Sequence, residues 1–154
     1  MPKKLSAGIV LYQRSGGRLE VFLVHPGGPF WAKKDAGAWS IPKGEYAEGD
    51  EPEAAARREF QEETGRELTG RFQVLTPRKQ RGGKLISAWA VEGDFGPARL
   101  TSNTLPLEWP PRSGRTQHFP EVDRGAWFDI PTAREKLLAG QRPFLDELLR
   151  FVRE

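Results

Sequence analysis

The stretch GEYAEGDEPEAAARREFQEETG, from Gly44 to Gly65, predicts one long helix that ends in a cluster of acids. Asp50 and Glu53 have the spacing of a capping box, and the first turn holds a proline, whose missing N–H costs nothing there. The residues that follow are mostly good helix formers, and Gly65 suits the left-handed position just after a helix. We therefore predict a helix over residues 51–64.

Three glutamates, Glu59, Glu62 and Glu63, crowd the C-terminal end of this helix within about a third of its circumference. Like charges at this spacing, and acids at this end of a helix, each cost up to about 1 kcal/mol. Arg58 can offset part of that cost by pairing with Glu62 four residues on. Such local conflict concentrates at functional sites, and a Mg²⁺ ion that bridges the carboxylates to substrate phosphates would explain it. The carboxylates alone also fit a solvated charged face.

The rest of the chain predicts strands around this helix and helices at the end. Short apolar runs and Gly-rich turns predict the strands, and helical spacing predicts the final helices, in this order: strands 5–14, 19–26, 71–80 and 84–95, a long polar loop 101–124, a strand 125–130, and helices 131–140 and 142–154. Gly140 is the expected stop between the two helices, and Phe144, Leu145, Leu148 and Phe151 form an apolar stripe on the last one. This order predicts a mixed α/β fold in one domain, residues 1–154.

Composition narrows the function classes. The net charge of +3 and the pI of about 9.4 allow an anionic ligand but do not require nucleic acid. The chain has no cysteine, which excludes disulfides and thiolate metal sites. The apolar run of residues 7–12 is too short for a signal peptide and is interpreted as a strand, and no segment reaches the length of a membrane span. We expect a cytoplasmic protein with no membrane partner.

The opening stretch as a whole resembles the Nudix box, G-x5-E-x7-R-E-U-x-E-E-x-G-U, in which U is a bulky apolar residue. The matching positions are Gly44, Arg58, Glu59, Phe60, Glu62, Glu63 and Gly65. Asp50 replaces the first glutamate of the box, and Arg66 replaces its last apolar residue. The preceding WSIPKGE, residues 39–45, is similar to the segment that leads into the box in many Nudix hydrolases, including diadenosine polyphosphate hydrolases. The chain also looks like small bacterial proteins described as NTP pyrophosphohydrolases.

This resemblance implies an α/β/α sandwich around a mixed β-sheet and a metal-dependent hydrolysis of a pyrophosphate bond. The metal is Mg²⁺, with Mn²⁺ as an alternative, and it activates the attacking water. Glu59, Glu62 and Glu63 are then the metal ligands, and Glu59 or Glu62 can also serve as the base. Arg58 orients the acidic cluster through a salt bridge, with Asp50 as one partner.

Residues just before the box are candidates for substrate binding. Lys43 can contact phosphate through its side chain and the metal through its carbonyl oxygen, and Gly44 lies beside it. Trp39 is a candidate for stacking on a nucleobase, as are Trp31 and Trp109. For any one tryptophan, packing in the core is the alternative.

Later parts of the chain offer further candidates. The resemblance points to Glu121 as an additional acid or base, and His118 nearby can bind phosphate or take a proton; an exposed loop is the alternative for both. Basic residues that can attract polyphosphate or RNA ends are Arg78, Lys79, Arg81, Lys84, Arg112 and Arg115.

The sequence thus predicts a hydrolase for a nucleotide pyrophosphate, with an NTP or a dinucleoside polyphosphate as substrate. Two alternatives stay open: removal of pyrophosphate from RNA 5′ ends, and a Nudix-fold nucleotide sensor without catalysis. The presence of Glu59, Glu62 and Glu63 favours an enzyme, because sensors of this fold commonly lose box carboxylates.

Overall fold

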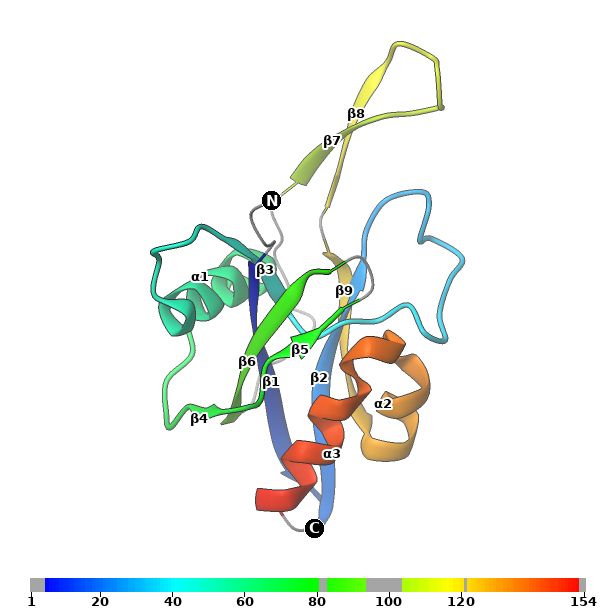
Figure 1. Cartoon of the computed structure of the whole chain (residues 1–154). Coiled ribbons are helices and arrows are strands. Elements are labelled where there is room, and N and C mark those ends of the chain that lie inside the picture. Colours follow the sequence, from blue (N-terminus) through cyan, green and yellow to red (C-terminus); the bar gives the residue numbers. More distant parts are fainter. Residues whose placement is uncertain (1–4, 81–82, 94–103, 121, 153–154) are drawn as a thin grey trace.

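The computed structural model describes residues 5–80, 83–93, 104–120 and 122–152, and its helices lie on both faces of a central sheet (Figure 1). The strands are β1 (Leu5–Ser15), β2 (Arg18–Pro26), β3 (Lys43–Tyr46), β4 (Gln73–Val74), β5 (Arg78–Lys79), β6 (Leu85–Glu92), β7 (Thr104–Glu108), β8 (Thr116–Pro120) and β9 (Val122–Asp129). The helices are α1 (Pro52–Thr64), α2 (Ile130–Lys136) and α3 (Arg142–Phe151), with a 3₁₀ turn, η2 (Ala139–Gln141), between the last two. Within the described residues, no helix combines the length and apolar character needed to cross a membrane.

The central sheet is mixed and is built around β1. Its strand order is β4-β6-β1-β2-β9, with β3 also paired to β1 and β5 also paired to β6. Strand β1 runs parallel to β6 and antiparallel to both β2 and β3. Because β3 pairs with the first residues of β1, Gly44 lies opposite Ala7 in the middle of the fold.

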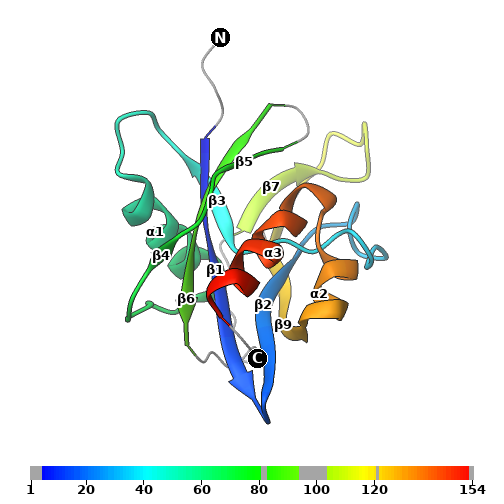
Figure 2. The ribbon, with the colours of Figure 1, turned by 60° about the horizontal axis from the view of Figure 1, so that its bottom comes forward.

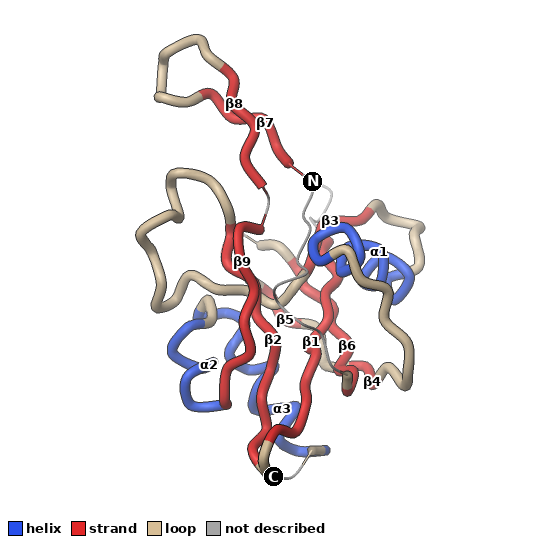
Figure 3. The backbone as a smooth tube through the Cα atoms, turned by 180° about the vertical axis from the view of Figure 1, so that it is seen from behind, coloured by secondary structure: helices blue, strands red, loops and turns tan. Residues whose placement is uncertain are grey.

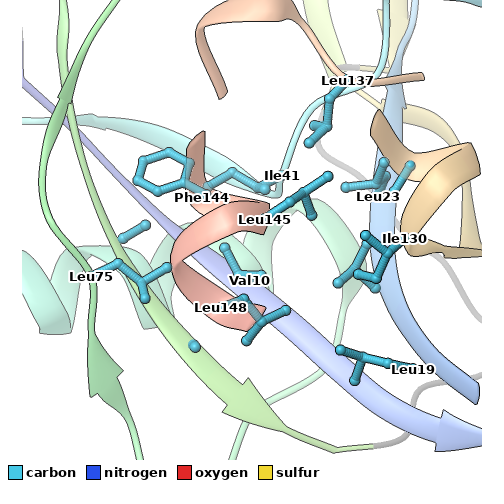
Figure 4. Close-up of a cluster of buried hydrophobic side chains, with 14 of the residues drawn as sticks. Val10, Leu19, Leu23, Ile41, Leu75, Ile130, Leu137, Phe144, Leu145 and Leu148 are labelled. Atoms are coloured by element: carbon cyan, nitrogen blue, oxygen red, sulfur yellow. The ribbon is translucent and has the colours of Figure 1, made fainter. Parts of the chain in front are cut away.

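Alternate residues of the strands face two separate cores. On one face α1 packs through Ala55, Ala56 and Phe60 onto a cluster that includes Ala7, Ile9, Leu11, Phe22, Val24, Trp89 and Val91. On the other face α2 and α3 cover a cluster that includes Val10, Leu19, Val21, Leu23, Ile86 and Ala88. Figure 2 shows α3 over this face of the sheet, and Figure 4 shows Val10, Leu19 and Leu23 within the cluster. The predicted α/β/α sandwich with a mixed sheet is confirmed.

The caps of α1 agree with the sequence at one end and differ at the other. Gly65 has φ 77° and donates its N–H to the Gln61 carbonyl oxygen over 2.7 Å, so its predicted role is confirmed. At the N-terminus Glu51, rather than Asp50, caps the helix and accepts hydrogen bonds from the N–H groups of Glu53 and Ala54 at 3.2 and 2.8 Å. Asp50 instead accepts the N–H of Ala47, so it closes the preceding turn.

The predicted hairpin of the first two strands is confirmed, but three later segments differ from the prediction. The expected loop 101–124 contains the β7–β8 hairpin, whose register runs from Thr104–Pro120 to Glu108–Thr116, and β9 begins already at Val122. The expected strand 71–80 is divided into β4 and β5, which both pair with β6.

The helices after β9 are shorter than the sequence predicts. Helix α2 ends at Lys136 rather than near Gly140, because Leu137 adopts extended backbone and forms a bridge to Trp39. Gly140 lies within η2. On α3 the predicted stripe is buried except for Phe151, whose side chain is 46% exposed.

Phe60→Ala should lower the free energy of unfolding by about 3–5 kcal/mol, because it opens a cavity between α1 and the sheet. Phe151→Ala removes the same ring from a half-exposed position and should cost about 1 kcal/mol or less. Urea denaturation of both variants measures the difference. Equal losses would contradict the assignment of Phe60 to the core.

Candidate active site

The carboxyl group of Glu59 on α1 lies directly against the backbone of Gly44 on β3. A Cβ atom at Gly44 would overlap that carboxyl group and would lie 2.6 Å from the Cγ atom of Glu59. Gly44 is not among the described glycines with positive φ, so this position requires glycine for space rather than for backbone conformation. The glycine at the start of the box therefore leaves room for the Glu59 carboxyl group against β3.

The three predicted metal carboxylates occupy different environments. Glu63 is only 7% exposed, and its Oε2 atom accepts the backbone N–H of Lys43 over 3.2 Å. The Glu59 side chain is largely buried and lies 3.6 Å from the guanidinium of Arg58. Glu62 is exposed to solvent. The structure thus brings Glu59 and Glu63 together at the Lys43–Gly44 segment and leaves Glu62 at the rim.

Arg58 does not make the ion pairs that the sequence predicts for it. Its Nη2 atom lies 3.6 Å from Oε1 of Glu59, whereas the described contacts include no pair with Glu62 or Asp50. Because α1 begins only at Pro52, Asp50 belongs to the preceding turn. Arg58 therefore still contacts the acidic cluster, but through its neighbour in the chain.

Lys43 carries a partly buried amino group beside these acids. Burial lowers its pKa from the ordinary value of 10.5, and the positive charge of Lys84 lowers the pKa further. Glu63, Glu45 and Glu59 act in the opposite direction but do not cancel the effect. Lys84 is itself held 3.3 Å from Oε1 of Glu45. The two lysines therefore form a region of positive charge next to the carboxylates.

Two cavities meet at Lys43. The smaller, of about 260 Å³, is lined by Val24, Pro26, Ser40, Ile41, Lys43, Glu63 and Val122. The larger, of about 510 Å³, is lined by Gly37, Lys43, Gln80, Lys84, Ile86, Leu138, Ala139, Gly140 and Gln141. The larger volume is in the range that small-molecule sites occupy. No local pattern predicts the η2 residues in this wall, because tertiary packing alone brings them there.

The donor atoms fit a hard divalent cation. Glu59, Glu62 and Glu63 offer carboxylate oxygens from one end of α1, and Mg²⁺ prefers such oxygens together with several waters. Within the described part of the chain, no three acidic or imidazole side chains already converge as a closed metal cluster. A cation here would therefore be held by a few carboxylates and completed by water and substrate oxygens.

The aromatic candidates lie in contrasting places. Trp39 is 4% exposed, its Nε1–H donates to Asp35 over 2.8 Å, and its ring packs edge-on against His25 and Phe128. This buried position corrects the sequence interpretation, because the ring is unavailable for stacking on a nucleobase. Trp31 and Trp109 are half-buried on the segments beyond β2 and β7.

The remaining candidates are His118 and Glu121. His118 is exposed on β8, and Glu121 lies outside the described residues. His25, which the sequence did not single out, is fully buried at the end of β2. Its Nδ1 atom is 3.0 Å from Oδ1 of Asp123, and its Nε2 atom is 2.6 Å from the Lys34 carbonyl oxygen. His25 thus joins the loop after β2 to the start of β9.

Comparisons with known proteins identify one family. Residues 2–148 match the family described as the NUDIX domain. A Caenorhabditis elegans Ap4A hydrolase has a similar structure, with 20% identity over 96% of each chain and a TM-score of 0.61. The NUDIX domain of Shewanella oneidensis NrtR, complexed with ADP ribose, is 18% identical over 97% of this chain and 88% of that one, with a TM-score of 0.65.

A mutT/nudix family protein from Listeria innocua is 18% identical over 97% of this chain and 94% of its own, with a TM-score of 0.62. The search of curated proteins found no match. At these identities the solved structures show a shared fold. Together with the family match over nearly the whole length, they establish that the chain belongs to the Nudix family.

Lys43→Met should raise the free energy of unfolding at pH 7, because it removes a buried positive charge whose pKa is lowered mainly by burial. As the pH rises through the lowered pKa towards 10.5, the folded parent loses the proton before the unfolded chain does. The penalty in the parent then disappears, so the advantage of the variant should shrink over this pH range.

Urea denaturation between pH 7 and pH 10.5 measures this trend. Lys79→Met, at an exposed position on β5, is the matched control and should show no such pH dependence. A stability difference that stays constant with pH in Lys43→Met would contradict the assignment.

Proposed function

We propose that this Nudix protein is a divalent-metal-dependent pyrophosphohydrolase that acts on a nucleotide pyrophosphate, either an NTP or a dinucleoside polyphosphate. The convergence of Glu59 and Glu63 on the Lys43–Gly44 segment, where both cavities meet, is the observation that supports it. Carboxylates on one side and lysines on the other suit a cation and a polyphosphate placed between them.

The residues of the acidic cluster have different roles in the proposed reaction. Glu59, Glu62 and Glu63 would hold Mg²⁺, or Mn²⁺ in its place, and the bound cation would neutralise phosphate oxygens and acidify the attacking water. Glu62 is the exposed member and would accept a proton from that water, with Glu59 as the alternative base. Arg58 keeps the Glu59 carboxylate oriented from 3.6 Å. As the new P–O bond forms, the bond from phosphorus to the bridging oxygen breaks, and the leaving phosphate keeps the electron pair.

Lys43 and Lys84 bind the phosphate chain. Burial of the Lys43 amino group makes its positive charge unfavourable in the free protein. The negative charge of a bound phosphate would offset part of this cost. The 510 Å³ cavity beyond the two lysines would receive the nucleoside or the terminal phosphates. Gly44 carries no side chain, which leaves the space beside Lys43 that the Glu59 carboxyl group occupies.

Two alternatives differ in what they require of the carboxylates. A sensor would bind a nucleotide without turnover, and it would not need Glu59, Glu62 and Glu63 together. The NUDIX domain of Shewanella oneidensis NrtR was solved as a complex with ADP ribose. An RNA 5′-end pyrophosphohydrolase would use the same carboxylates on a longer substrate. The retained carboxylates favour either enzyme over the sensor.

The test is phosphate release, coupled to inorganic pyrophosphatase, across a panel of NTPs, dinucleoside polyphosphates, nucleotide sugars and 5′-triphosphorylated RNA. Turnover should require Mg²⁺ and stop in EDTA. Glu63→Gln should reduce kcat by about 10²–10⁴-fold, in the range typical for loss of a group that acts in the transition state. Product identities then name the substrate class.

Glu67→Gln, an exposed substitution just beyond α1, is the matched control and should keep parental activity. Nucleotide binding without turnover on any substrate would contradict the enzyme and support the sensor. Equal loss of activity in both variants would remove the special role given to Glu63.

A further inference from the structure

An exposed surface of aromatic and basic side chains lies beyond the candidate active site. It is formed by residues 27–36, which follow β2, and by the β7–β8 hairpin, which projects from the sheet on the same side (Figures 1 and 3). The side chains that define this aromatic–basic face are Phe30, Trp31, Lys34, Trp109, Arg112 and Arg115. Phe30 and Trp109 join the two segments, with ring centroids 5.5 Å apart at 76°.

Phe30 is the most exposed ring of this face, and the two tryptophans are partly exposed. The Phe30 side chain is 60% exposed, the highest value among the exposed large hydrophobic side chains of the described residues. Trp31 and Trp109 are half-buried, and the Lys34 amino group lies 5.0 Å from the centroid of the Trp31 ring. Exposed rings with cations beside them form the kind of platform on which unpaired bases stack.

The charges of the face are unbalanced. Lys34, Arg112 and Arg115 make no ion pair among the described residues, although all three are exposed. Two nearby carboxylates are engaged elsewhere, because Asp35 bonds Trp39 and Lys136 and Asp123 bonds His25. The third, Glu108, lies on the hairpin and accepts the backbone N–H of Arg112, so three cations stand against one carboxylate on this face. The face therefore presents positive charge that is complementary to a phosphate backbone.

The backbone at the hairpin tip is also unusual. Arg112 has φ 62°, a left-handed conformation that costs a non-glycine residue about 1 kcal/mol or more. Its N–H donates to Oε1 of Glu108 over 3.1 Å, which holds the turn in this shape. A glycine would adopt this conformation freely. The turn therefore holds Arg112 in a backbone conformation that is unfavourable for arginine.

Both segments are firmly anchored next to the candidate active site. Pro26 and Val122, at their roots, line the 260 Å³ cavity that contains Glu63. A Cβ atom at Gly27 would overlap the Pro120 carbonyl group, so the two roots are in close contact. A polymer bound on the face would therefore lead towards the carboxylates.

We propose that the aromatic–basic face binds single-stranded RNA, with bases on the exposed rings and phosphates on Lys34, Arg112 and Arg115. A duplex keeps its bases stacked inside and would gain nothing from the rings. RNA is chosen over DNA because it is the polynucleotide that is generally single-stranded. This binding does not depend on the acidic cluster, so it is independent of the hydrolase proposed above.

Fluorescence anisotropy with a labelled, unstructured 15-nucleotide RNA tests the proposal on the full chain, in EDTA so that no turnover occurs. Affinity should fall as salt rises, and Arg112→Ala with Arg115→Ala should reduce the log–log salt slope by about 1.4, which corresponds to two lost phosphate contacts on a single strand. Trp31→Ala should weaken binding by about 5- to 150-fold through lost stacking.

The matched control is Arg134→Ala with Arg150→Ala, which removes the same charge from α2 and α3 on the other side of the fold. It should leave the salt slope within about 0.3 of the parent, because these arginines contact no RNA. Circular dichroism checks that each variant is folded. If Trp31→Ala does not fold, the double variant Arg112→Ala with Arg115→Ala still tests the aromatic–basic face, because both arginines are exposed.

Three results would overturn the proposal. The first is no RNA binding at about 50 mM salt, which would exclude RNA as the ligand. If sedimentation then shows that the protein self-associates, the face is an interface between copies of the chain. Equal loss in the two double-arginine variants would show that net charge alone attracts RNA. Tighter binding of a duplex of the same length would exclude stacking on the rings.

Discussion

The contact between the Glu59 carboxyl group and the backbone of Gly44 sets where that carboxyl group lies, and the site is built from that contact. Gly44 lies opposite Ala7 of β1, in the middle of the fold, while Phe60 anchors the same helix in the core beneath. With α1 packed in this position, the Glu63 carboxylate accepts a hydrogen bond from the backbone N–H of Lys43. Any side chain at residue 44 would displace the Glu59 carboxyl group from this position.

The energetic cost of the site is concentrated in a few residues of the free protein. Acids gather at the negative end of α1, Glu63 is buried, and the pKa of Lys43 is lowered because its charge is poorly solvated. Part of this cost is offset locally, by the hydrogen bond to Glu63 and by the Arg58 ion pair. A divalent cation would bring positive charge to the acids of α1, and a polyphosphate would bring negative charge to Lys43. These unfavourable features of the free protein therefore agree with the proposed function.

Local sequence signals predicted the elements whose causes are themselves local. The SGG turn gave the β1–β2 hairpin, and Gly65 ended α1 where expected. Long-range packing decided the rest: Leu137 leaves the helical pattern to bridge Trp39, which is buried rather than available for stacking. The Pro-rich composition of residues 101–124 concealed the β7–β8 hairpin, and nothing near His25 in the sequence predicted its contacts with Asp123 and the Lys34 carbonyl.

The most direct measurement of the central claim is the affinity for Mn²⁺, followed by electron paramagnetic resonance in the full chain without nucleotide. Glu59→Gln and Glu63→Gln should each weaken Mn²⁺ binding by at least about tenfold, since each removes a charged oxygen donor, whereas Glu67→Gln should bind as the parent does. Unchanged affinity in both substituted proteins would show that the cation is not held by the carboxylates that meet at Gly44, and would contradict the account.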